Sequence, residues 1–281
     1  MRALITGGGG QLASDLAEQL GADAFLDAPP VKVPQADLRA AIESHVNQLK
    51  GQIDAYAARD YPAAYENVRE AYHHMFMTGD ALAGGIAAQQ PDMFSAGGVT
   101  ASASDLRVGL GRLLGEHAIL AMTATQKGFS GAKDFDAIAK SLDANSVDLA
   151  DAIGSVYGEE ARTTFLDGDL LWRDHIGFFV DYTVGLAEKD TAAQEKAVGN
   201  LMGYVEAFSS FLADATGAPQ ADLRSAIESH VMQLKGQIDA YAAGEYTTAY
   251  EAFREAYRHM YMMGDTLAAA IVAQSPEKFS S

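Results

Sequence analysis

Six of the seven histidines of this chain stand at nearly the same distance from a predicted helical turn. Four helix–turn–helix segments can be identified, with turns near Asp60, Gly131, Lys189 and Glu245. Four of the histidines precede a turn by about 14 or 15 residues, and two follow the first and last turns by about 14, which is about 21 Å at the helical rise. In chain order they are His45, His74, His117, His175, His230 and His259.

If the hairpins pack side by side with their turns aligned, these imidazoles meet on common levels of the core, which is how helical bundles build metal sites. Imidazole binds copper, zinc, iron and nickel. Copper comes first because methionines such as Met122, Met232 and Met260 lie near the histidines in sequence, and thioether with imidazole favours copper. The predicted metal ligands are His117, His175, His230 and His259, with His45 and His74 as a duplicate half-site.

Acidic residues accompany the histidines. Glu116 and Asp174 directly precede His117 and His175, and Glu228 lies two residues before His230. Carboxylates commonly accept the second ring N–H of a metal-bound histidine, so these three are predicted to orient the rings. Antiparallel geometry also places Asp148 near the level of His117, and Tyr204 near that of His175. The alternative is a set of structural histidines whose common level was inherited from one ancestral hairpin.

The chain contains a long internal repeat. Residues Pro34–Phe94 and Pro219–Phe279 align without gaps at an offset of 185, with 43 of 61 positions identical. Two diverged hairpins, at about 103–156 and 165–215, lie between the copies. This organisation predicts an atypical segment over 1–30, a partial repeat over 31–96 and a main helical domain over 97–281.

Helical periodicity predicts the fold. Apolar residues step by three or four through both copies and through 106–121, and proline is confined to segment edges. We expect an all-α protein of antiparallel hairpins packed as two adjoining up-down bundles, with eight main helices. The hairpin over 31–96 lacks a full set of neighbours, and a lone hairpin is marginal in water, so dimerisation or domain exchange is expected.

Composition excludes several classes of function. The formal net charge of −18 argues against nucleic acid and anionic membranes as partners. The chain has no cysteine, which excludes disulfides and thiolate metal sites. No apolar run is long enough to predict a membrane span. The His-Glu-x-x-His zinc motif and the Gly-x-Ser-x-Gly elbow are absent from the sequence, and the Glu-x-x-His spacing of ferritin-like sites is absent around the six candidate histidines.

The first residues carry a different pattern. Met1–Leu12 resembles the first strand and glycine-rich turn of dTDP-4-dehydrorhamnose reductases, which would imply a dinucleotide site. The resemblance covers about 20 residues, and no further βαβ unit follows, so we do not expect dinucleotide binding. Two other interpretations stay open: a shortened helix of a preceding repeat over Gln11–Leu20, or a fused or misassigned start.

The residues after 97 carry a second resemblance. The acid–histidine and Ser229-His230 helices, the joint Phe208–Gly217 and the closing segment Ala270–Phe279 are similar to helical repeat domains of bacterial, often extracytoplasmic, proteins. Some of those domains carry a copper-amine-oxidase-like label. The resemblance implies a helical bundle and favours an extracytoplasmic location over a cytoplasmic one. Amine oxidase catalysis is not expected, since the Thr-x-x-Asn-Tyr-Asp/Glu cofactor sequence is absent.

These patterns favour a non-catalytic protein that binds copper, or zinc or iron in its place, for storage, buffering or delivery. Two alternatives stay open. One is an acidic protein-interaction or cell-surface module with structural histidines. The other is a metal-dependent redox enzyme that uses the same site.

Overall fold

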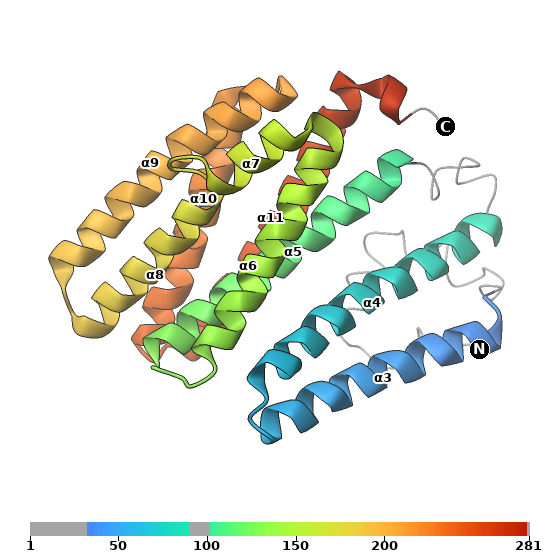
Figure 1. Ribbon diagram of the computed structural model, residues 1–281, viewed down its shortest axis with the longest axis horizontal. Coiled ribbons are helices and arrows are strands. Elements are labelled where there is room, and N and C mark those ends of the chain that lie inside the picture. Colours follow the sequence, from blue (N-terminus) through green and yellow to red (C-terminus); the bar gives the residue numbers. More distant parts are fainter. Residues whose placement is uncertain (1–32, 90–101, 280–281) are drawn as a thin grey trace.

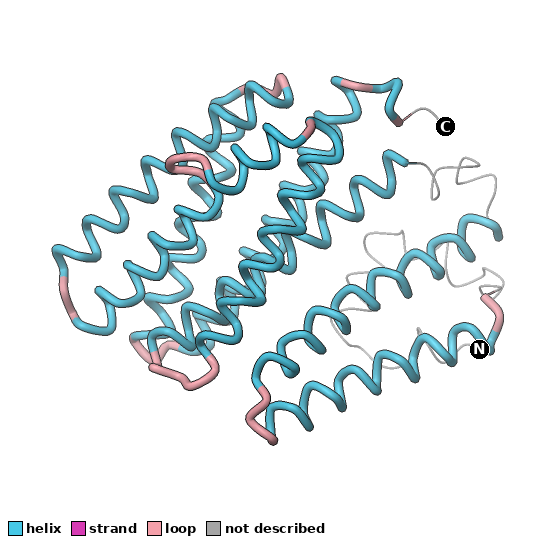
Figure 2. The backbone as a smooth tube through the Cα atoms, viewed as in Figure 1, coloured by secondary structure: helices cyan, strands magenta, loops and turns pink. Residues whose placement is uncertain are grey.

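The structure, a computed structural model, describes residues 33–89 and 102–279. The predictions for residues 1–30 lie outside these ranges. Within them the chain is helical and contains no strand (Figure 2). The helices are α3 Gln35–Ala57, α4 Tyr61–Gln89, α5 Ser102–Phe129, α6 Phe135–Tyr157, α7 Glu159–Asp167, α8 Trp172–Glu188, α9 Thr191–Thr216, α10 Gln220–Ala242 and α11 Tyr246–Gln274, followed by a 3₁₀ turn at Pro276–Lys278.

The predicted fold class is confirmed. The pairs α3–α4, α5–α6, α8–α9 and α10–α11 are antiparallel hairpins, and their turns lie at one end of the molecule (Figure 1). Local residues set the turns. Gly131 adopts φ +60, and Lys189 ends α8 in the left-handed conformation. The Asp190 carboxylate then caps α9 by accepting a hydrogen bond from the Ala193 backbone N–H.

Helices α5 to α11 form one bundle, and the α3–α4 hairpin lies beside it. Helices α5 to α11 share the main core, which includes Leu120, Leu201 and Val231. The short α7, which the sequence analysis did not separate from its neighbours, connects α6 to α8 across one end of the bundle (Figure 1). Helix α4 packs on α5 and α6, while α3 packs mainly on α4 at the outer edge.

Buried polar contacts hold the outer hairpin in place. The Arg69 guanidinium of α4 donates to Glu116 of α5 at 2.9 Å and to Asp148 of α6 at 2.7 Å. At the turn end, the Tyr65 hydroxyl donates to Asp134 at 2.7 Å. Burial alone would raise the pKa of Asp134, but hydrogen bonds from Lys127 and Tyr65 lower it below its usual value. These contacts fix which face of α4 is turned toward the bundle.

Glycine sets the closest helix contact. A Cβ atom on Gly264 of α11 would lie 2.8 Å from the backbone nitrogen of Gly111 in α5, so α5 and α11 touch through their backbones. Gly79 holds the equivalent position in the first repeat copy, and a Cβ there meets nothing within 4 Å. The same residue therefore serves packing in one copy only.

This pair yields a prediction. Gly264→Ala should lower the free energy of unfolding by about 1–3 kcal/mol, because backbone must move to admit the methyl group. Gly79→Ala, the matched change in α4, should raise it by about 0.5–1 kcal/mol through the better helix propensity of alanine. Urea denaturation measures both. Equal effects of the two substitutions would contradict the packing described here.

Candidate metal centre

Three of the predicted ligands meet in the core. His117 of α5, His175 of α8 and His230 of α10 are almost fully buried, and each offers a nitrogen within 4.8 Å of the others. The ring centroid of His117 lies 5.4 Å from that of His175 and 5.9 Å from that of His230. The three come from the first helices of the second, third and fourth hairpins, so the common level expected from the sequence is present.

Aromatic rings fix the orientation of two imidazoles. Tyr204 of α9 stacks on His175 at 4.5 Å between centroids, at the level that the sequence analysis expected. The Trp172 ring lies 4.7 Å from His117 and 4.9 Å from His175. Its indole N–H donates to the Ser146 hydroxyl of α6 at 3.1 Å, which holds the ring in that position. The histidines therefore sit in a packed aromatic environment.

The imidazole nitrogens have almost no hydrogen-bond partners. Among the described residues, neither ring nitrogen of His117 or His230 has one, nor does Nδ1 of His175. A buried polar group left without a partner costs about 1–3 kcal/mol, so native cores rarely retain one. Several such nitrogens converging at one point are a fit for a metal ion, whose bonds would use their lone pairs.

Burial keeps the three rings neutral. Loss of solvent lowers the pKa of His175 and of His230 to about 3, and proximity of the neighbouring imidazoles lowers both further. Burial and then His175 likewise depress the pKa of His117 well below its ordinary value. Neutral imidazole is the metal-binding form, so no proton has to be removed at neutral pH.

The predicted carboxylate partners serve other contacts. Glu116 accepts hydrogen bonds from Arg69 and from Asn145 at 2.8 Å. Asp174 accepts one from the Leu170 backbone N–H at 2.8 Å, and Glu228 is exposed. The prediction that these carboxylates orient the histidine rings is therefore wrong. Adjacent helix positions point about 100° apart, so an acid beside an inward histidine faces a neighbouring helix or solvent.

The remaining predicted ligands lie outside the group. His259 Nε2 is 2.8 Å from the Ala226 carbonyl oxygen, and His74 Nε2 makes the equivalent 2.8 Å contact with Ala41. His45 stacks on His74 with centroids 6.4 Å apart, on the outer hairpin. Of the methionines near the histidines in sequence, Met232 and Met262 are exposed, whereas Met122 and Met260 are buried in the main core. The structure thus forms a three-imidazole group.

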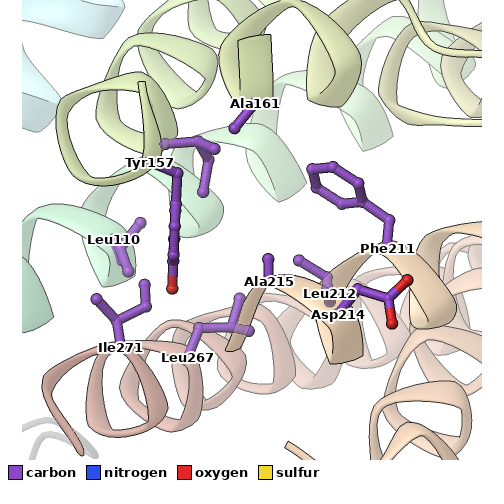
Figure 3. A pocket seen from close by; sticks show the side chains of 10 residues that line it. Leu110, Tyr157, Ala161, Phe211, Leu212, Asp214, Ala215, Leu267 and Ile271 are labelled. Carbon is purple, nitrogen blue, oxygen red and sulfur yellow. The ribbon is translucent and has the colours of Figure 1, made fainter. Parts of the chain in front are cut away.

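Two pockets border the core. One, of about 390 Å³, runs from the α5–α6 turn to His117 and His175, with Ala124, Phe179 and Leu234 among its lining residues. The other, of about 370 Å³, lies between α5, α6, α7, α9 and α11 (Figure 3). Leu110, Phe211 and Ile271 line this second pocket, and no histidine of the triad does. The first pocket therefore connects the triad with the surface.

Comparisons with known proteins identify no relative. No family model, no curated protein and no solved structure matches the chain. The structure also has no helix long and apolar enough to cross a membrane within the described residues. The chemistry of the site therefore has to be argued from its own residues.

The depressed pKa values predict a pH dependence for the metal-free protein. Unfolded histidine titrates near 6.5, so between about pH 6.5 and 3 the unfolded chain binds protons that the buried rings refuse. Stability should fall as pH drops below 6.5, by up to about 1.4 kcal/mol per pH unit for each ring. His175→Phe, which keeps the stacking on Tyr204, should reduce this slope by one ring's share. Urea unfolding at stepped pH between 7 and 5 measures the slope of stability against pH for each protein. Identical slopes for the unaltered protein and His175→Phe would contradict the prediction.

Proposed function

We propose that this protein binds one transition-metal ion through His117, His175 and His230 and serves in metal storage, buffering or delivery. The observation that supports this most directly is the set of converging buried nitrogens without hydrogen-bond partners. A tetrahedral ion with nitrogens at about 2.0–2.1 Å needs ligand atoms about 3.4 Å apart. The present separations, within 4.8 Å, close to that value with side-chain shifts of about 1 Å.

The donor set bears on which metal binds. Three neutral imidazoles, with no thiolate and no carboxylate, suit copper and zinc better than calcium or magnesium. Divalent copper binds nitrogen sites more tightly than zinc or iron, so copper remains the first candidate. Of the three methionines behind the copper prediction, Met232 is exposed, while Met122 and Met260 are buried in the main core. Zinc is therefore the next candidate, followed by iron.

Structural histidines are the competing account. A histidine kept in a core for structure normally has its ring nitrogens hydrogen-bonded. His74 and His259 follow that rule, each through a backbone carbonyl oxygen 2.8 Å away. His117 and His230 lack partners at both ring nitrogens, which favours metal binding there, while His175 has a backbone hydrogen bond with Trp172.

Metal content tests the proposal. Purified, tag-free protein loaded with copper or zinc should retain about one ion per chain after dialysis, as measured by mass spectrometry. His230→Ala should abolish retention while circular dichroism keeps its helical signal. His45→Ala makes the same change at the equivalent residue of the outer hairpin and should retain the ion. Retention by His230→Ala, or loss in both variants, would refute the proposed site.

A metal-dependent redox enzyme is the second candidate function. The pocket that reaches His117 and His175 gives a small molecule a route to a metal held by three ligands. Catalytic metal sites commonly keep such a fourth position open, whereas structural sites close it. The lining is mainly apolar, so neutral molecules would enter more readily than ions.

A coordination experiment tests the open position. Cobalt(II)-loaded protein titrated with 4-methylimidazole, a neutral ligand, should change its visible absorption spectrum as the ligand binds cobalt. Ala124→Leu narrows the pocket and should weaken this ligand at least about 10-fold without releasing cobalt. Ala161→Leu, in the pocket of Figure 3, is the matched control and should have no effect. No spectral change in the unaltered protein would mean a closed site.

A further inference from the structure

The two repeat copies differ in which residues they bury, although 43 of their 61 aligned positions are identical. Helices α10 and α11 bury sixteen residues, and fifteen of the equivalent positions in α3 and α4 carry the same residue. The exception is Thr78, which stands where α11 has Met263. Val231 and Ile238 of α10 are 0% exposed, whereas the equivalent Val46 and Ile53 of α3 are 55% and 67% exposed.

We define the α3 face as the stripe of α3 that matches the buried stripe of α10. Ile42 and Leu49 are also exposed, at 47% and 40%. In the part of the chain that the structure describes, α4 covers the edge of this stripe at His45, and no helix covers its exposed part, since α3 lies at the outer edge with α4 on its inner side (Figure 1). The members of the α3 face are Leu38, Ile42, His45, Val46, Leu49, Gln52 and Ile53.

The second copy shows what kind of neighbour this stripe accepts. In α10 the same stripe packs on α5, α8 and α9. Arg224, beside the stripe, pairs with Glu206 of the antiparallel α9 at 2.9 Å. Asp239, further along α10, accepts a hydrogen bond from the Tyr182 hydroxyl of α8 at 2.6 Å. The stripe therefore packs among helices that bring polar partners for the flanking charges, one of them on the antiparallel α9 and one on α8.

One chain cannot cover both stripes with the helices described. The core formed by α5, α8 and α9 accepts one hairpin, and α10–α11 occupies it. If two copies exchanged hairpins, each would still have one stripe exposed. With the helices described, both leftover stripes are covered when the two α3 faces pack on each other, which makes a second copy of this chain the fitting partner.

The charges on α3 are arranged for that partner. Arg39 and Glu43 form one exposed ion pair, and Lys50 and Asp54 form another. All four lie on one flank of the α3 face at 100° per residue. In an antiparallel pair related by a two-fold axis beside Val46, Arg39 faces Asp54 of the second copy. By the same symmetry Glu43 faces Lys50 of the second copy, so every contact joins opposite charges.

We propose that two copies of this chain dimerise through their α3 faces, packed antiparallel about Val46, with each α4 on the side of its α3 that faces away from the second copy. The dimer is independent of the metal centre, whose ligands lie on α5, α8 and α10. Analytical ultracentrifugation of the full chain should therefore give twice the 29.7 kDa chain mass, with or without metal.

Substitutions test the packing. Val46→Glu places two carboxylates beside the two-fold axis and should raise the dimer dissociation constant at least about 100-fold, because like charges are costly in an interface. Met232→Glu is the control, because Met232 of α10 is exposed to a similar extent (50%). It should leave the dimer mass unchanged. A monomeric unaltered chain at about 100 µM, or equal effects of both substitutions, would overturn the proposal.

A charge exchange tests the orientation. Arg39→Asp brings two aspartates together at both ends of the dimer and should weaken it about 10-fold. Adding Asp54→Arg restores opposite charges between copies, although it removes the remaining ion pair within α3. Recovery of the dimer in the double variant supports the antiparallel pairing. If these charges acted only within α3, the double variant would dimerise more weakly still, and that result would contradict the antiparallel pairing.

Discussion

Three imidazoles that share one core position and have almost no hydrogen-bond partners are the constraint on which this structure depends. Burial depresses their pKa values and keeps them neutral, so the core carries no buried charge. The aromatic rings of Trp172 and Tyr204 hold two of them in place. Without a ligand, the converging nitrogens are an unmet cost of folding. If a metal ion bound there, the same nitrogens would form metal–ligand bonds that add to the stability of the core.

Helix α5 connects this site with the rest of the molecule. Its His117 belongs to the triad, its Gly111 admits α11, and its Glu116 binds Arg69 of the outer hairpin. The Tyr72 and Tyr257 hydroxyls, at equivalent repeat positions, lie 3.0 Å apart. A Cβ on Gly115 would come within 3.0 Å of both side chains, so that glycine leaves the room for this meeting. One helix thus organises both repeat copies, although it belongs to neither.

Periodicity and repetition were enough to predict the hairpins, their turns and the common level of His117, His175 and His230. They could not show which hairpin enters the core, because α3–α4 has the same residue as α10–α11 at fifteen of the sixteen positions that α10–α11 buries. Among the buried positions of α10 and α11, the one that differs between the copies is Met263, where α4 has Thr78. The acid beside each histidine was misread as its partner, since sequence adjacency on a helix separates side-chain directions.

X-ray absorption spectroscopy of the copper- or zinc-loaded protein tests the central claim most directly, because it sees the ligand atoms themselves. The account predicts three imidazole nitrogens at about 2.0–2.1 Å, with the outer-ring scattering that histidine produces. It also predicts that this pattern disappears when His117 is replaced. A first shell of oxygen atoms, or a histidine pattern that survives the replacement, would contradict the proposal that the buried triad is a metal centre.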